Sequence, residues 1–344
     1  VREILYPLEN ETTHYEQIVE ELVHNQILGF KKLHLKERKA EHIILLGNTF
    51  IERMLEKQGS LQENRTVSFK EFMAGYEWVM SSSPEEMSVS LGISLDYAEN
   101  MVPALIIYRV FMEEFGAQTL WLPGTHLNDG ISYDYAQKHK LIKSKHNFEN
   151  DILVAARNIA KRYSTGKDHI KGTTDLALAI FDSMKKVHGM GDRERLLLQI
   201  AVQLHDCGKY ISMGDVAECS YQIIMATEII GLSTEERQII ANAVRYNTTE
   251  FVYYSEIAGE VGMDRSVYLL IAKLTAILRI ANAMDRSHYQ KVKNMKAMLK
   301  DRTLLLTVDS EQDISLELGL LMDKVEFFEE VFGIRLVFRR KRKV

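Results

Sequence analysis

The chain has 344 residues, of which 46% are hydrophobic and 26% charged. These proportions exclude wholesale disorder, provide enough apolar surface for a core, and at this length predict two or three domains. A net charge of −5 gives no global nucleic-acid signature. Two cysteines, Cys207 and Cys219, favour a reduced cytoplasm, and no run of about 18 apolar residues predicts a membrane span.

Charge is unevenly distributed along the chain. Residues 1–135 contain 11 basic and 21 acidic side chains, whereas residues 136–344 contain 32 basic and 27 acidic ones. The run RRKRK at residues 339–343 accounts for the basic excess of the second segment. The contrast indicates a domain boundary and a basic tail, which is either simply solvated or binds a phosphate-rich polyanion.

Residues 1–138 alternate short apolar strands with helices. The spacing and capping patterns predict an extended segment at 1–8, strands at 42–46 and 118–122, and helices at 12–34, 49–57, 68–80, from Ser83 onward and at 95–115. Residues 121–136 (WLPGTHLNDGISYDYA) turn from the second strand into a further helix. Such alternation predicts an α/β unit.

The strand signal disappears between residues 139 and 292. Apolar residues recur there at helical spacing, as in 193–206, which predicts an all-α domain. The remaining residues are mixed, with strand-like 304–308, helical 318–332 and strand-like 334–338. The expected fold class is α+β and mostly α, with domains at 1–138, 139–292 and 293–344.

A histidine–aspartate pair, His205 and Asp206, ends one of the apolar helices, and His169 opens another helix 36 residues upstream. Imidazole nitrogen and carboxylate oxygen together can bind a metal ion. The pattern resembles the HD-domain superfamily of helical metal phosphohydrolases, in which bound metals assist attack of water on phosphorus. Alternatively, the three residues do not bind a metal and have structural roles only. Asp206 then caps the next turn, His205 is a hydrogen-bonded core histidine, and His169 is a residue at the start of a helix.

Three further ligand positions of that superfamily are changed in this sequence. They hold Cys219 (in ECSYQII), Asn247 (in VRYN) and Asn282 (in LRIANAMDR). An asparagine brings no charge to attract a metal ion, so the sequence predicts a weakened metal site. Asp285, one turn from the lost carboxylate, is a possible substitute.

The order of the segments resembles the exopolyphosphatase / guanosine pentaphosphate phosphohydrolase family over essentially all 344 residues. The segments that carry the resemblance are HIILLGN (42–48), WLPGTHLNDGISYDYA (121–136), ECSYQII, VRYN and LRIANAMDRSH. It implies part of an actin-like (ribonuclease-H-like) subdomain, a degenerate HD-like domain and a small C-terminal α/β domain. It also implies Mg²⁺ as cofactor, polyphosphate or guanosine pentaphosphate as substrate, a cytoplasmic homodimer, and neither a membrane nor a specific nucleic acid as partner.

The family's Gly-rich phosphate loops, of the D-x-G-S-N and D-x-G-G-G-S types, have no match in the sequence, and no residue corresponds to its catalytic Glu. The chain opens with VREILYPLE rather than with Met. We therefore expect the catalytic part to lie upstream and this chain alone to be inactive, with its catalytic residues unknown.

Candidate phosphate- or nucleotide-binding residues remain. Gly47 and Asn48 follow a strand, where backbone N–H groups can approach a phosphate or where the pair merely caps the next helix. The basic candidates for a polyanion path are Lys209, Arg245, Arg279, Arg286 and the run 339–343, each of which is alternatively a solvated or helix-stabilising charge.

Three functions are therefore compatible with the sequence. The leading one is an exopolyphosphatase-like phosphatase. The second is a non-catalytic HD-like module that binds a nucleotide or polyphosphate, and the third is an HD-type metal phosphohydrolase that uses His169, His205 and Asp206.

Overall fold

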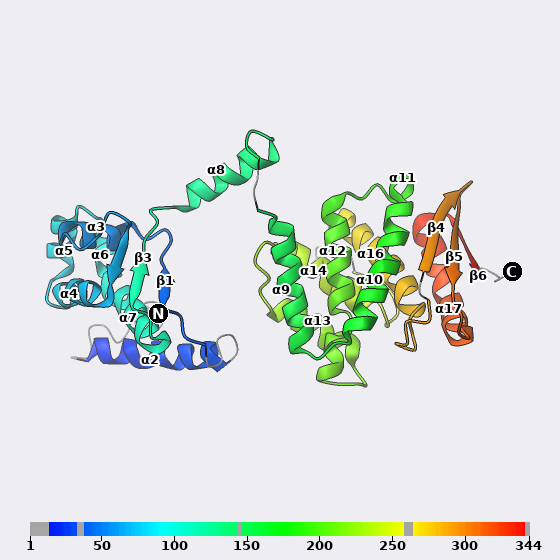
Figure 1. Cartoon of the computed structure of the whole chain (residues 1–344), viewed down its shortest axis with the longest axis horizontal. Coiled ribbons are helices and arrows are strands. Elements are labelled where there is room, and N and C mark those ends of the chain that lie inside the picture. Colours follow the sequence, from blue (N-terminus) through cyan, green and yellow to red (C-terminus); the bar gives the residue numbers. More distant parts are fainter. Residues whose placement is uncertain (1–13, 33–37, 144–145, 258–263, 293, 341–344) are drawn as a thin grey trace. The chain divides into compact units, whose positions relative to one another are not determined.

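A computed structural model describes residues 14–32, 38–143, 146–257, 264–292 and 294–340. The extended segment predicted at 1–8 lies outside the described residues. The chain divides into two compact units, Val1–Ser144 and Lys145–Val344, each with its own elements (Figure 1). We describe each unit by itself.

The first unit combines three short strands with seven helices in its described part. Its elements are α2 (Tyr15–Phe30), β1 (His42–Ile44), α3 (Thr49–Lys57), β2 (Thr66–Ser68), α4 (Phe69–Met80), α5 (Pro84–Leu91), α6 (Leu95–Glu99), α7 (Met101–Phe115), β3 (Thr119–Trp121) and α8 (Leu127–Lys138). The sheet has the order β1-β3-β2, with β1 parallel and β2 antiparallel to β3.

Capping residues set the ends of several helices in this unit. Ser68 and Ser83 each form a capping box with the glutamate three residues later, Glu71 and Glu86, which starts α4 and α5. The helix predicted at 95–115 is interrupted at Asn100, where α6 ends and α7 begins. The three-residue strand β2 was not predicted, because only its central residue is buried and so short a strand has no detectable period.

The second unit begins as a helical bundle. Its helices are α9 (Phe148–Arg162), α10 (Lys167–Ser183), α11 (Lys185–His188), α12 (Asp192–Leu204), the 3₁₀ turn η2 (Cys207–Tyr210), α13 (Val216–Ala226), α14 (Thr234–Arg245), α15 (Tyr254–Ile257) and α16 (Arg265–Ala283). No strand occurs in the described residues between 146 and 292, as predicted. The fold is α+β and mostly α.

The chain ends in a three-stranded sheet with one helix. Strands β4 (Asn294–Lys300) and β5 (Thr303–Asp309) form a hairpin, and β6 (Arg335–Arg340) pairs parallel to β5 after helix α17 (Ser315–Phe332). The strand β4 was not predicted. One continuous hydrophobic core joins this sheet and α17 to the bundle, so that both belong to the same compact unit.

Helix α16 lies at the centre of the bundle. It is the one helix of the described residues that is long and apolar enough to cross a membrane, but 67% of its most apolar window is buried inside the protein. Its apolar character is therefore that of a core helix.

Candidate metal centre

Three segments of the second unit bring imidazole and carboxylate groups together. His169 lies in the first turn of α10, and His205 follows the last residue of α12. Asp206 comes next and precedes η2, while Asp285 and His288 lie just beyond the end of α16. These helices carry apolar faces that pack into one core, and this packing draws residues 36 and 116 positions apart into contact.

The orientation of His205 is fixed by the backbone. The side chain is buried, and its Nδ1 donates a hydrogen bond to the carbonyl oxygen of Val202 at 2.7 Å. Burial lowers the pKa of His205, which keeps the imidazole neutral. With the proton on Nδ1, the Nε2 atom presents a lone pair to its surroundings.

The orientation of His169 is fixed by a carboxylate. Its Nδ1 lies 2.7 Å from Oδ2 of Asp285, and both side chains are buried. Burial by itself would raise the pKa of Asp285, but hydrogen bonds from His169 and Gln290 outweigh it and hold the pKa below its usual value. An ionised carboxylate accepts the Nδ1 proton of His169, and this hydrogen bond leaves Nε2 as the ring nitrogen that faces His205.

The Nε2 atoms of the two histidines face each other. The Nε2 atoms of His169 and His205 are 3.1 Å apart. Two acceptors at this distance repel unless a proton or a metal ion lies between them. Two nitrogen ligands of a tetrahedral Zn²⁺, at the usual bond length of about 2.0–2.1 Å, lie about 3.3 Å apart. The spacing therefore fits a pair of metal ligands.

Further ligand atoms surround this pair. Asp206 places Oδ2 3.9 Å from Nε2 of His169, and Oδ1 3.5 Å from Nε2 of His205. His288 stacks on His169 with ring centroids 3.6 Å apart, and its Nε2 is 3.8 Å from Oδ2 of Asp206. Ligand atoms of His169, Asp206 and His288 all lie within 4.8 Å of one another.

The charge state of the cluster suits metal binding. Burial and the neighbouring His169 lower the pKa of His288 to about 4, so its ring is neutral at pH 7. Burial would raise the pKa of Asp206, but His205 and Lys209 outweigh it and keep the pKa lowered. Lys209 Nζ lies 2.5 Å from Oδ2 of Asp206 and forms an ion pair with that carboxylate.

The donor set determines which metal fits. Imidazoles with carboxylates suit Zn²⁺, Mn²⁺, Fe²⁺ or Co²⁺, whereas Mg²⁺ takes oxygen ligands and retains several waters. The cluster therefore does not fit the Mg²⁺ that the resemblance implies, and it does fit a transition metal.

The sequence-predicted ligands have different positions in the structure. His169, His205 and Asp206 come together as expected. The side chains of Asn282, Asn247 and Cys219 form no hydrogen bond with the cluster in the described part of the chain, and the buried Oδ1 atoms of both asparagines have no partner there. Sequence reasoning considered Asp285 only as a substitute and missed His288. The signal was the spacing of three residues in DRSH, which brings both side chains to one site as the helix ends.

The basic candidates of the second unit lie in varied surroundings. Lys209 pairs with Asp206, and Arg245 pairs with Glu218 and stacks on Tyr221. Arg286 is exposed. Arg279 is buried, donates to the carbonyls of Tyr246 and Thr249, and lies over the ring of Phe327, which makes it a structural residue. Of the run 339–343, Arg339 and Arg340 belong to β6, and the other three residues lie outside the described part.

In the first unit, Gly47 and Asn48 form the turn into α3. Gly47 has φ +75°, a left-handed conformation that favours glycine, and its N–H donates to the carbonyl of Thr125 at 3.2 Å. Asn48 occupies the N-cap position, but its side-chain amide donates to the hydroxyl of Tyr108 instead of capping the helix.

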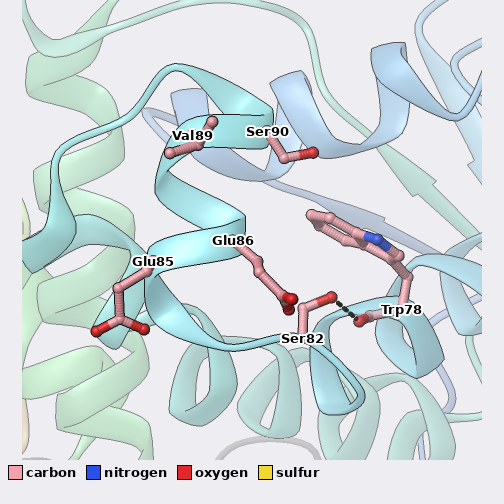
Figure 2. A pocket seen from close by; sticks show the side chains of 6 residues that line it. All are labelled: Trp78, Ser82, Glu85, Glu86, Val89 and Ser90. Atoms are coloured by element: carbon pink, nitrogen blue, oxygen red, sulfur yellow. Dashed lines mark hydrogen bonds between the residues drawn. The ribbon is translucent and has the colours of Figure 1, made fainter.

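A surface hollow of about 630 Å³ lies elsewhere in the first unit (Figure 2). It is lined by Trp78, Ser82, Glu85, Glu86, Val89 and Ser90, none of which the sequence had indicated. Two glutamates and no basic group form this lining, so the hollow does not suit a phosphate. Ser82 donates to the carbonyl oxygen of Trp78 at 2.7 Å, as the dashed line shows.

Comparison with known proteins identifies the family. No curated protein matches the sequence. Residues 154–326 match the family model described as Ppx/GppA phosphatase, domain III, and this span contains all five residues of the His/Asp cluster. The match covers half of the chain, and the chain therefore belongs to the Ppx/GppA phosphatase family.

Proposed function

We propose that the protein is an exopolyphosphatase-type phosphatase, which hydrolyses phosphoric anhydrides. In this proposal the residues of the present chain bind the substrate. The substrate is polyphosphate or guanosine pentaphosphate. The observation that carries the proposal is the domain III match over residues 154–326. The 344 residues contain no Gly-rich phosphate loop of the family's kind, so we expect binding by this chain without turnover.

A paired measurement tests this function. Binding of polyphosphate and of guanosine pentaphosphate to the full chain is measured by calorimetry, and phosphate release from both is followed with Mg²⁺ present. We expect the chain to bind at least one of the two and to release no phosphate above the rate without protein. Failure to bind either compound would contradict the proposal.

The His/Asp cluster favours a second candidate, an HD-type metal phosphohydrolase. His169, His205, Asp206 and His288 would hold the ion, and Asp285 would orient His169. When bound, such an ion supplies Lewis-acid assistance to hydrolysis at phosphorus. The side chain of His288 is 35% accessible, so this ligand is the one that solvent or a phosphate could reach from outside.

Metal analysis tests this candidate directly. The full chain is equilibrated with Zn²⁺ or Mn²⁺, dialysed, and assayed for metal per chain and for the shift in Tm. We expect about one ion per chain and a rise in Tm, because an ion that binds only the folded state stabilises it. His288→Ala should lose the ion, whereas His139→Ala, an exposed histidine of the first unit, should retain it. A wild-type chain that binds neither metal would remove this candidate.

A further inference from the structure

The C-terminal sheet has one covered face and one open face. Successive side chains of a strand point to opposite sides, so the register of the three strands assigns each residue to one face. Leu304, Leu306 and Val308 of β5 are buried in the core, and Leu336 of β6 lies with them. The strands and α17 lie together at the C-terminal end of the chain (Figure 1).

The open face carries four cations in a regular arrangement. Lys296 of β4, Thr307 of β5 and Arg339 of β6 form one row across the sheet. Lys300, Thr303 and Arg335 form a second row. With a rise of about 3.3 Å per residue and strands about 4.8 Å apart, the cations mark a rectangle of about 13 by 10 Å.

These four cations, which we call the basic face, have no carboxylate partner among the described residues. No ion pair involves Lys296, Lys300, Arg335 or Arg339 in the part of the chain that the structure describes, and all four are exposed. By contrast, Arg193 and Arg195 of the same unit pair with Glu236 and Asp182. Four unpaired positive charges on a sheet repel one another, so the arrangement favours binding of an anion that bridges them.

Within the three described strands and the hairpin turn, acidic groups lie only at the margins of this face. Asp309 stands opposite Asn294 at one end of the sheet, and Asp301 lies in the hairpin turn at the other. Threonine hydroxyls stand between the cations in both rows and can donate hydrogen bonds to phosphate oxygens. The sequence continues after β6 with Lys341, Arg342 and Lys343, which add positive charge.

The row between the two basic rows indicates what kind of anion fits. It consists of Met298, Leu305 and Val337, which are aliphatic. Single-stranded nucleic acids bind to sheets by stacking bases on aromatic side chains. The three strands place no aromatic ring on this face, because Phe338 alternates to the covered side and packs against the core. A phosphate chain without bases is therefore favoured.

We propose that the basic face binds a linear inorganic polyphosphate chain, with Lys296, Lys300, Arg335 and Arg339 as its cationic contacts. The choice of polyphosphate rests on the proposed function, whereas the location rests on the sheet register and on the unpaired charges. Each contact displaces a condensed counterion from the polyanion, so the affinity depends on salt.

Binding of long-chain polyphosphate to the full chain, without Mg²⁺, tests the location. The variant combines Lys296→Gln, Lys300→Gln, Arg335→Gln and Arg339→Gln. We expect its Kd to rise by about 100-fold at about 0.1 M salt, and the slope of log K against log salt to fall by about 3, since each contact contributes about 0.7. A matched control replaces four exposed cations of α9 and α11 by Gln, namely Arg157, Lys161, Arg162 and Lys186. We expect less than a threefold change for the control.

The outcomes separate this inference from the proposed function. A quadruple variant that binds polyphosphate within about threefold of wild type overturns the basic face as the site. Wild type that binds guanosine pentaphosphate but not polyphosphate overturns the inference and leaves the proposed function intact. A third outcome concerns an oligouridylate with the same number of phosphates. If it binds wild type more tightly than polyphosphate does, and if the quadruple variant loses this binding, the face binds nucleic acid and the inference is overturned. Circular dichroism of the variant and the control checks that both are folded.

Discussion

Asn282 lies in the last turn of α16 and Asp285 lies just beyond its end, and the structure gives them different surroundings. Asp285 reaches His169 at 2.7 Å, whereas the buried Oδ1 of Asn282 has no partner among the described residues. The position that family resemblance marks as a ligand thus makes no side-chain hydrogen bond with the cluster in the described part of the chain, whereas a carboxylate three residues later does. A helix turns about 100° per residue, so a shift of three residues changes which groups a side chain meets.

Replacing Asn282 by Asp should destabilise the protein. The new carboxylate would be buried without a counter-ion, at a cost of about 3 kcal/mol at pH 7. Burial raises the pKa of such a group in the folded state, so the loss should vanish at low pH, where the carboxyl is protonated in both states, and grow as pH rises above about 3.9. Urea unfolding of Asn282→Asp at several pH values measures this. A variant that gains stability and binds Zn²⁺ more tightly would show that position 282 is a ligand position.

Replacing Asp285 by Asn tests whether this carboxylate orients His169. The amide is close in shape but leaves His169 Nδ1 without an ionised acceptor, and loss of such a partner typically lowers metal affinity by about 10- to 100-fold. Competition with a chromogenic chelator gives the Zn²⁺ affinity of Asp285→Asn and of wild type. Equal affinities would mean that Asp285 has only a structural role.

At the scale of elements, close contacts between helices hold the cluster in place. The turn η2, which follows Asp206 directly, packs against α13 at Gly208. A Cβ atom at Gly208 would lie 2.3 Å from the carbonyl oxygen of Val216 and 2.6 Å from the amide nitrogen of Ser220. Both neighbours are backbone atoms and cannot rotate away.

We therefore expect Gly208→Ala to destabilise the protein by about 2–3 kcal/mol, the upper part of the range for overpacking. The matched control is Gly319→Ala in α17, where a Cβ would meet nothing within 4 Å. An alanine within a helix should there stabilise the protein by about 0.5–1 kcal/mol. Thermal and urea unfolding compare both variants with wild type, and equal effects of the two would contradict the packing argument.

A bidentate ion pair joins α12 to α14. Arg193 donates from Nε and from one guanidinium nitrogen to the two carboxylate oxygens of Glu236 at 2.6 and 2.8 Å, while Glu236 also caps α14 through the N–H of Ser233. The hydrogen bonds from Arg193 outweigh burial and hold the pKa of Glu236 below its usual value. The stability that this carboxylate contributes is therefore present above its unfolded pKa and is lost as pH falls through the folded one.

Glu236→Gln should lower the free energy of unfolding by about 1 kcal/mol at pH 7, after allowance for solvent screening of a partly exposed pair. The difference from wild type should shrink as pH falls below about 4.5 and disappear once Glu236 is protonated. Glu235→Gln, on the exposed neighbour, serves as control and should show little change. If the free energy of unfolding of Glu236→Gln is lower than that of wild type by the same amount at every pH, the ion pair is not the cause of the difference.

At the scale of the whole molecule, each unit has its own hydrophobic core. The second unit packs its helices, its sheet and α17 around one core, and the first unit contains two smaller clusters. Residues 139–143, which follow α8, are exposed. Compact units with separate cores are expected to survive cleavage of the chain between them.

Brief trypsin treatment should therefore cut first near Lys138, Lys140 or Lys143 and leave two resistant fragments. Mass spectrometry identifies the cut sites, and the larger fragment should retain any Zn²⁺ binding of the full chain, because the whole His/Asp cluster lies in it. First cleavage within either core would contradict the division into two units.

The sequence determined most of the helices and part of the candidate metal centre. Local signals such as the capping residues Ser68 and Ser83 predicted the helix starts, because each cap depends on residues three positions apart. The short strands β2 and β4 escaped prediction, because their pairing with distant partners, rather than their own pattern, stabilises them.

Only the tertiary structure decided which side chains complete the site and which charges remain unpaired. His169, His205 and Asp206 were visible as a motif, but His288 meets His169 only because α10 and α16 pack together. Likewise, the run 339–343 was visible as a basic tail, yet the four cations of the basic face come from three strands that only their pairing aligns. Sequence fixes which groups a segment carries, whereas packing fixes which groups from different segments share a face.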